Sequence, residues 1–178
     1  MVKYISKSIS HRQVRKDKMN EEVRIKLRSV RFEVEESLFS VDDPELEGGE
    51  RESVEVEPEI VEINTVGRLI VENGRVEIVY DETEVTGMEG STTIVTFAAD
   101  AKEMVSMIRE GVVSTALVFE GGKRHHCVYN TPYMPFEVCV HTLKVDNRLI
   151  DQKYIDLDYI VEIRGAKAER TKFRLELL

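Results

Sequence analysis

Glu82 and Arg109 are the charged residues whose sequence positions best suit chemistry inside a folded protein. Glu82 continues the every-second-residue pattern of Ile78 and Tyr80, and Arg109 follows Met107 in the same way. Successive side chains of a strand point to opposite faces, so both charged groups are expected on the dry face of their strands. Because a buried charge is costly unless it is paired, we predict an ion pair between Glu82 and Arg109.

This predicted pair has three interpretations. It could be a structural ion pair near one end of a barrel, a polar cluster that orients a ligand in a barrel mouth, or part of an enzyme that uses Glu82 and Arg109 there. A β-bulge near Gly87 would instead turn Glu82 out to solvent. Tyr129 and Thr131 lie in phase with Cys127 and are assigned to the same cluster. We predict no catalytic residue, and the candidate ligand-binding residues are Tyr80, Glu82, Arg109, Tyr129 and Thr131.

His126, Cys139 and His141 are of the types that bind zinc. If their two segments form a hairpin in which Asn130 pairs with Glu137, His126 lies opposite His141 and shares an outer face with Cys139. The spacing nevertheless matches neither a CxxC nor an HExxH motif. We therefore predict no metal site and no cofactor, and we expect both cysteines of the chain to be free thiols.

Alternation of apolar and polar residues with a period of two runs through most of the chain and indicates strands with one dry face. The Asn73–Gly74 pair between two such runs is the strongest hairpin signal. Residues 100–108 could also form a helical turn. We predict about 8–10 short strands joined mainly by tight turns, which is typical of a sandwich or barrel. The candidate segments for these strands are 23–28, 60–65, 67–72, 76–81, 92–99, 103–108, 113–120, 125–131, 136–145, 155–163 and 172–177.

The fold class predicted from this pattern is all-β, a closed antiparallel meander barrel. Closure is favoured because an open meander of this length would leave two unprotected strand edges. At 178 residues the chain is expected to form one domain. That domain covers residues 21–178, after a basic and disordered tail over 1–20 and with a long acidic loop at 42–59. The tail is expected to contribute little to folding.

The charge and hydropathy of the chain exclude some classes of function. A net charge of −9 argues against nucleic-acid binding, because phosphate contacts need clustered Lys and Arg. No stretch approaches the roughly 20 apolar residues of a membrane helix, and the basic N-terminus lacks the apolar region of a secretory signal. We therefore expect a cytoplasmic protein that binds neither nucleic acid nor a membrane.

An ordered series of short motifs runs through the chain, at 80–82, 87–90 with 92–93, 108–111, 119–120, 129–133, 138–142 and the strand around Tyr159. On the order and spacing of these motifs, the chain from about residue 22 to the end resembles the YwiB-like bacterial proteins, a family of domains of unknown function. The resemblance implies a small intracellular barrel of the calycin (lipocalin-like) type and supplies no established activity or catalytic residue. The chain has Met134 and Pro135 where the family usually has glycine, and its acidic loop is longer than expected.

The function expected from these observations is non-catalytic binding of a small apolar or amphipathic ligand inside the barrel. One alternative is a structural or protein-interaction barrel whose interior is filled by side chains, with a protein partner or a second copy as its target. The other is an enzyme that uses Glu82 and Arg109. Interior volume separates the first two, because a cavity of about 300 Å³ or more supports ligand binding and a solid core does not.

Overall fold

The computed structural model describes residues 18–34, 57–163 and 168–178. The predicted basic tail and acidic loop therefore lie mostly outside the described residues. None of the helices in the described part of the chain has the length and apolar character needed to cross a membrane.

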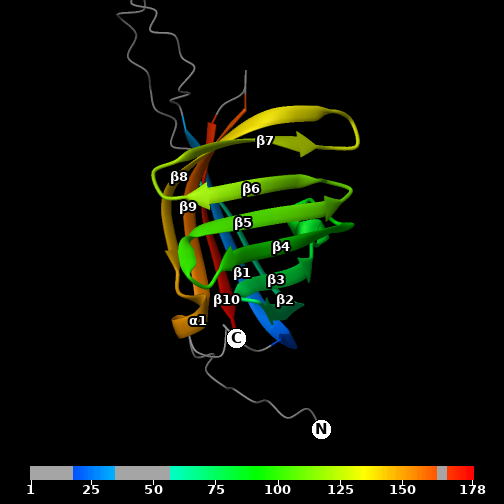
Figure 1. Cartoon of the computed structure of the whole chain (residues 1–178). Coiled ribbons are helices and arrows are strands. Elements are labelled where there is room, and N and C mark those ends of the chain that lie inside the picture. The colour runs from blue at the N-terminus through cyan, green and yellow to red at the C-terminus, as the bar shows by residue number, and fades with distance from the viewer. Residues whose placement is uncertain (1–17, 35–56, 164–167) are drawn as a thin grey trace, which may run out of the picture.

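The described residues form ten strands and two very short helices (Figure 1). The first strands are β1 (Met19–Val34), β2 (Glu59–Glu72) and β3 (Arg75–Asp81), followed by the 3-10 helix η1 (Glu84–Thr86). Next come β4 (Ser91–Ala98), β5 (Ala101–Gly111), β6 (Thr115–Glu120), β7 (Arg124–Asn130) and β8 (Pro135–Asn147). The chain ends with α1 (Leu149–Gln152), β9 (Tyr154–Ile163) and β10 (Ala168–Leu177).

All ten strands belong to one antiparallel sheet in the order β6-β5-β4-β3-β2-β1-β10-β9-β8-β7. The first and last strands pair, so the meander curls into a barrel whose two edges are β6 and β7. In the described chain, these edges share a single bridge, in which Ser114 and Asn130 exchange backbone hydrogen bonds of 3.0 and 2.9 Å. The predicted all-β antiparallel barrel is confirmed, and it is nearly closed, with a seam between β6 and β7.

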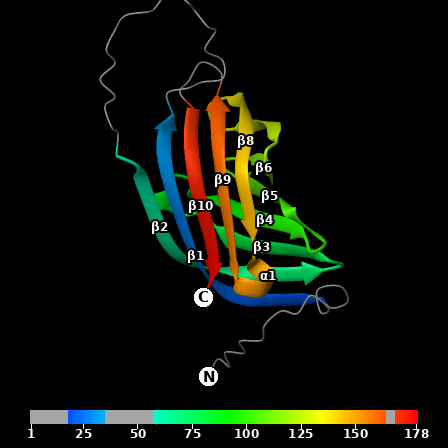
Figure 2. The same ribbon diagram turned by 90° about the vertical axis from the view of Figure 1, so that its left-hand side faces the viewer.

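The barrel is flattened because its two halves cross. Figure 2 shows β1 and β2 curving along their length, so that β3 to β6 run across the direction of β8 to β10. Gly67 lies within the curved β2, where the sequence suggested a break between two strands. A Cβ atom on Gly67 would lie 2.4 Å from the Val79 carbonyl oxygen and 2.6 Å from Ile25 Cδ1. This glycine therefore permits close packing of neighbouring chains, and β2 continues through it without a turn.

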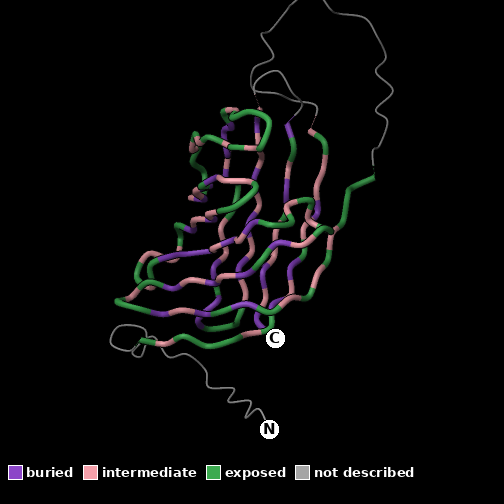
Figure 3. The backbone as a smooth tube through the Cα atoms, turned by 90° about the vertical axis from the view of Figure 1, so that its right-hand side faces the viewer, coloured by how far each residue is buried: buried purple, intermediate pink, exposed green. Residues whose placement is uncertain are grey.

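The core lies between the two halves of the bent sheet. Buried and more exposed residues alternate along the strands, as the period of two predicts (Figure 3). Residues 101–108, for which a helical turn was an alternative, belong to strand β5. Residues with no solvent exposure include Ile25, Ile78, Val95, Val105, Met107, Phe119, Val140, Ile155 and Leu175.

Gly111, the last residue of β5, has a conformation that other residues rarely adopt. Its φ is +135°, and a Cβ atom there would lie 2.3 Å from the Gly90 carbonyl oxygen and 2.8 Å from Ser91 Cα.

We expect Gly111→Ala to lower the free energy of unfolding by at least about 1–3 kcal/mol, because the cost of the strained φ and the cost of the backbone clash add up. Gly121→Ala is the control, since a Cβ on Gly121 meets nothing within 4 Å. Equal urea-unfolding midpoints for the two variants would contradict the expectation.

Candidate functional site

A row of polar side chains crosses the inner face of β3 to β6. The strand register places Tyr80 opposite Thr93, Thr93 opposite Arg109, and Arg109 opposite Thr115. Glu82 follows β3 directly, and its backbone N–H donates to the Ser91 carbonyl at 2.9 Å. This bond keeps the chain extended past the end of β3, so the Glu82 side chain points inward like that of Tyr80. Glu82 is only 6% exposed, and the alternative in which a bulge turns it outward is wrong.

Glu82 and Arg109 form the ion pair that parity predicts. Arg109 Nε lies 3.4 Å from Glu82 Oε1, and the two side chains are 12% and 2% exposed. The Thr93 hydroxyl donates a hydrogen bond to the same carboxylate oxygen. Arg109 Nη2 also approaches Met107 Sδ, a weak acceptor, at 3.2 Å. We call Glu82 and Arg109 the buried pair.

The buried pair retains hydrogen-bonding capacity. A carboxylate has two acceptor oxygens and a guanidinium has five N–H donors. Among the described residues, no hydrogen bond or ion pair engages Glu82 Oε2 or Arg109 Nη1. Both groups therefore keep an acceptor or donor for a further partner.

The buried pair lines a cavity of about 460 Å³ between the two halves of the sheet, which we call the barrel cavity. Its polar lining residues are Ser29, Arg31, Tyr80, Glu82, Thr86, Arg109, Tyr129, Tyr159, Glu169 and Thr171. Its apolar lining residues are Leu27, Val61, Ile63, Gly87, Met88, Leu117, Val138, Val161, Ile163 and Phe173. Four of the five predicted ligand-binding residues thus come together around one space.

Thr131, the fifth predicted ligand-binding residue, is not among the residues that line the barrel cavity. Strand β7 ends at Asn130, so the alternation that placed Thr131 on the inner face stops one residue earlier. The Thr131 hydroxyl donates to the Met134 carbonyl at 2.9 Å and accepts from the Met134 N–H at 3.2 Å. These bonds hold the turn between β7 and β8.

Several polar cavity residues were missed from the sequence, among them Tyr159, Arg31 and Glu169. Tyr159 lies on β9, where its ring packs 4.7 Å from that of Phe119; its alternation with Leu157 could have placed it inside. Arg31 and Glu169 lie 3.9 Å apart, with side chains 31% and 50% exposed. The predicted first strand stopped at residue 28, before Arg31, because the apolar alternation weakens there. We call Arg31 and Glu169 the outer pair.

Burial sets the ionisation of the polar cavity residues. Burial, together with the nearby Glu82 carboxylate, raises the pKa of Tyr80. Burial also raises the pKa of Tyr159, although the Arg109 charge opposes this shift. For Arg109 itself, burial lowers the pKa, but the net shift is upward because Tyr129, Tyr159, Tyr80 and Glu82 favour its charge. Near pH 7 the phenol hydroxyls of Tyr80 and Tyr159 are therefore neutral and lie near the charged Arg109 guanidinium.

The histidines and cysteines adopt a register different from the predicted one. His126 pairs with Cys139, whereas His141 pairs with Arg124, two residues from the predicted alignment. The reason is the turn, which closes on an Asn130–Pro135 pair. The described residues contain no group of three or more His, Cys, Asp or Glu side chains arranged to hold a metal ion. Burial, with the nearby Glu162, raises the pKa of Cys139, and both thiols are free.

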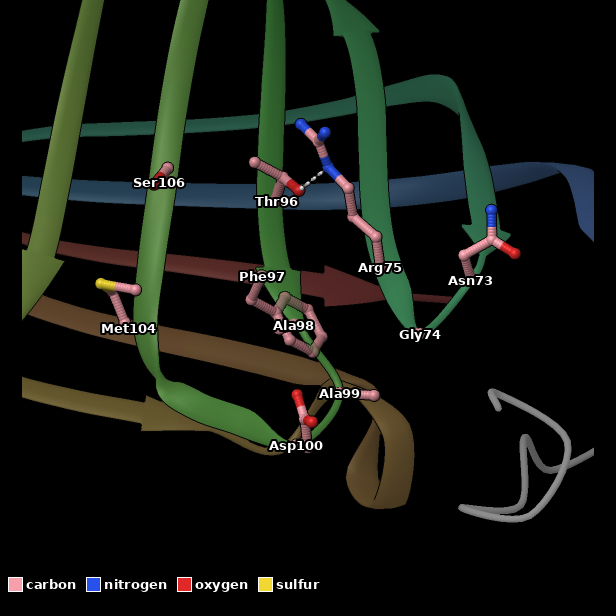
Figure 4. A pocket seen from close by; sticks show the side chains of 10 residues that line it. All are labelled: Asn73, Gly74, Arg75, Thr96, Phe97, Ala98, Ala99, Asp100, Met104 and Ser106. Atoms are coloured by element: carbon pink, nitrogen blue, oxygen red, sulfur yellow. Dashed lines mark hydrogen bonds between the residues drawn. The ribbon is translucent and has the colours of Figure 1, made fainter. Parts of the chain in front are cut away.

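A larger hollow, of about 600 Å³, lies on the outer surface beside the β2–β3 and β4–β5 turns (Figure 4). Its one basic residue, Arg75, is already bonded, with Nε 3.1 Å from the Thr96 hydroxyl and 2.8 Å from Glu77 Oε1. Its walls include Asp100 of the β4–β5 turn and Met104 of β5, which is 47% exposed. The hollow has no buried charged group, and we place the candidate site in the smaller barrel cavity, which the buried pair lines.

Comparisons with known proteins agree with this fold. The chain is similar to the crystal structure of ywiB protein from Bacillus subtilis, with a TM-score of 0.58 and 17% sequence identity over 89% of this chain and 93% of that chain. At this identity the likeness shows the fold alone. No curated protein sequence matches the chain. The family model described as "Domain of unknown function (DUF1934)" matches residues 46–175. The YwiB-like resemblance is therefore confirmed, and the chain belongs to this family of domains of unknown function.

Proposed function

We propose that the barrel binds a small amphipathic ligand in the barrel cavity without catalysing a reaction on it. The observation that carries this proposal is the volume of about 460 Å³, which lies within the range of small-molecule sites. A barrel whose interior is filled by side chains would leave no such space. The proposal also agrees with a calycin-type assignment of the barrel, which we propose with it.

The polarity of the walls supports an amphipathic ligand over a purely apolar one. The buried pair closes one part of the cavity with side chains at most 12% exposed, whereas the outer pair is 31% and 50% exposed. The other walls of the cavity include the apolar residues Leu117, Val138 and Val161. A ligand with one polar head and an apolar body matches this lining, because its head can bond to the buried pair while its body displaces water from the apolar walls.

Narrowing the cavity should abolish binding. Val161 on β9 lines the cavity, whereas its neighbour Ile160 points to the opposite face of the same strand. We expect Val161→Trp to weaken binding of the neutral fluorescent probe N-phenyl-1-naphthylamine at least about tenfold, since the indole occupies the space of the ligand. Fluorescence titration, with excitation outside the tryptophan absorption band, measures the dissociation constant.

The matched control is Ile160→Trp, which adds the same ring outside the barrel and should leave the dissociation constant within about twofold. Ile63→Trp narrows the cavity from β2 and guards against a folding defect peculiar to one site. If both inward variants fold and bind the probe as tightly as Ile160→Trp does, the ligand site is elsewhere. That result would favour the interaction barrel.

A further inference from the structure

The charges that line the barrel cavity balance. Two basic residues, Arg31 and Arg109, and two acidic residues, Glu82 and Glu169, line it. Arg109 lies 3.4 Å from Glu82 in the buried pair, and Arg31 lies 3.9 Å from Glu169 in the outer pair. Arg31 also pairs with Glu59, at 3.2 Å, but Glu59 does not line the cavity. An ionised ligand head would therefore bring an uncompensated charge into a cavity whose own charges are already matched, and it would lose its hydration on entry.

The buried pair is nevertheless able to bond a head group on both sides. Glu82 accepts from Thr93 and Arg109 through Oε1 only, so Oε2 is an available acceptor among the described residues. Arg109 reaches Glu82 through Nε and Met107 through Nη2, so Nη1 is an available donor in the same part of the chain. Because Glu82 and Arg109 are in contact, this acceptor and this donor match a ligand head group that carries both a hydrogen-bond donor and a hydrogen-bond acceptor.

From this arrangement we propose that the buried pair selects an uncharged head group that donates and accepts hydrogen bonds, of which a primary carboxamide is the simplest. This inference rests on the proposed function. The amide N–H donates to Glu82, and the amide carbonyl accepts from Arg109. A carboxylate head would approach the Glu82 carboxylate with the same charge, and an ammonium head would approach the Arg109 guanidinium likewise. Each ionised head is therefore repelled by the member of the buried pair that has the same charge, whereas the neutral carboxamide is not.

A series of ligands with one apolar body and different heads tests the proposal. Decanamide, decanoate and decylammonium are titrated into the full chain at neutral pH by calorimetry, below the concentrations at which they form micelles. We expect decanamide to bind at least about tenfold more tightly than either ionised analogue, because burying an unmatched charge is costly. Equal or tighter binding of decanoate or decylammonium overturns the head-group inference and leaves the proposed function standing. If none of the three binds, the proposed function itself fails.

Changing one member of the buried pair should shift this preference in opposite directions. Glu82→Gln leaves a positive charge in the cavity, so binding of decanoate should strengthen relative to decylammonium. Arg109→Met leaves a negative charge, so decylammonium should gain relative to decanoate. Glu77→Gln, which removes an equal charge on the outer face of β3, should leave the ratio unchanged. A purely structural role of the buried pair would weaken all three ligands in parallel, and that result contradicts the inference. The comparison on the unaltered chain decides the case if a variant does not fold.

Discussion

Removing either member of the buried pair should destabilise the barrel by about 3–5 kcal/mol, which is the usual cost of leaving a buried charge without its partner. Glu82→Gln leaves the Arg109 guanidinium without its carboxylate. Arg109→Met leaves the Glu82 carboxylate with the Thr93 hydroxyl as its one bonded side chain among the residues that the structure describes. The double variant removes both charges, so its loss should be clearly smaller than the sum of the single losses. Urea unfolding of the three variants and the unaltered protein measures the coupling free energy.

A second ion pair in the same sheet provides the control. Arg75 and Glu77 lie on the outer face of β3, with Arg75 Nε 2.8 Å from Glu77 Oε1 and side chains 59% and 24% exposed. Water screens this shorter contact, so its coupling free energy should stay below about 1 kcal/mol. The comparison separates burial from distance, since the longer pair is expected to be the stronger. Additive losses below about 1 kcal/mol at Glu82 and Arg109 would show that their side chains act independently.

The fold could be predicted from the sequence because its main signal is local. Alternation with a period of two survives in a sheet that has one dry face, and Asn73–Gly74 forms the expected hairpin turn, with positive φ at both residues. Incomplete closure could not be predicted, because it depends on how far β6 and β7 diverge after the β6–β7 turn. The continuity of β2 through Gly67 was also hidden. In a sequence, a glycine can mark either a turn or a position where a neighbouring backbone approaches closely. Only the position of the neighbouring strand tells which of the two applies.

The same reasoning explains which site residues were found. Tyr80, Glu82, Arg109 and Tyr129 follow the parity of apolar neighbours on their own strands, and the strand register then brings them together. Thr131 was assigned by the same rule, which fails at the end of a strand. Arg31 and Glu169 share the parity of Leu27 and Phe173, but the polar Ser29 and Thr171 interrupt the apolar series before it reaches them. Their pairing is also long-range, so no local pattern brings the two residues together. Sequence periodicity thus identifies the side chains that point inward, whereas the shape of the enclosed space needs the three-dimensional structure.

Phe119→Ala should cost about 3–5 kcal/mol, the range for truncating a buried aromatic side chain. Phe119 is fully buried on the edge strand β6, and its ring centroid lies 4.7 Å from that of Tyr159 on β9. Within the described chain, β6 is joined to β7 by the single bridge between Ser114 and Asn130. The aromatic contact across the barrel therefore holds an edge strand that has few hydrogen bonds on one side. Losing this contact should loosen the seam as well as the core.

Val118→Ala is the matched control for Phe119→Ala, because Val118 points to the opposite face of β6 and is half-buried. Its loss should stay near 1 kcal/mol, as for a truncation outside a packed core. Hydrogen exchange locates the effect. Phe119→Ala should raise the amide exchange rates of Ser114 and Asn130, relative to the unaltered protein, more than it raises the rate of Ile25 in the centre of β1. If the exchange rates rise uniformly over all strands, the seam is not a separate weak point. If the loss is similar to that of Val118→Ala, the Phe119–Tyr159 contact does not hold β6. The first outcome would still be consistent with Phe119 as a core residue. The second outcome would show that contacts other than Phe119–Tyr159 hold β6 in the barrel.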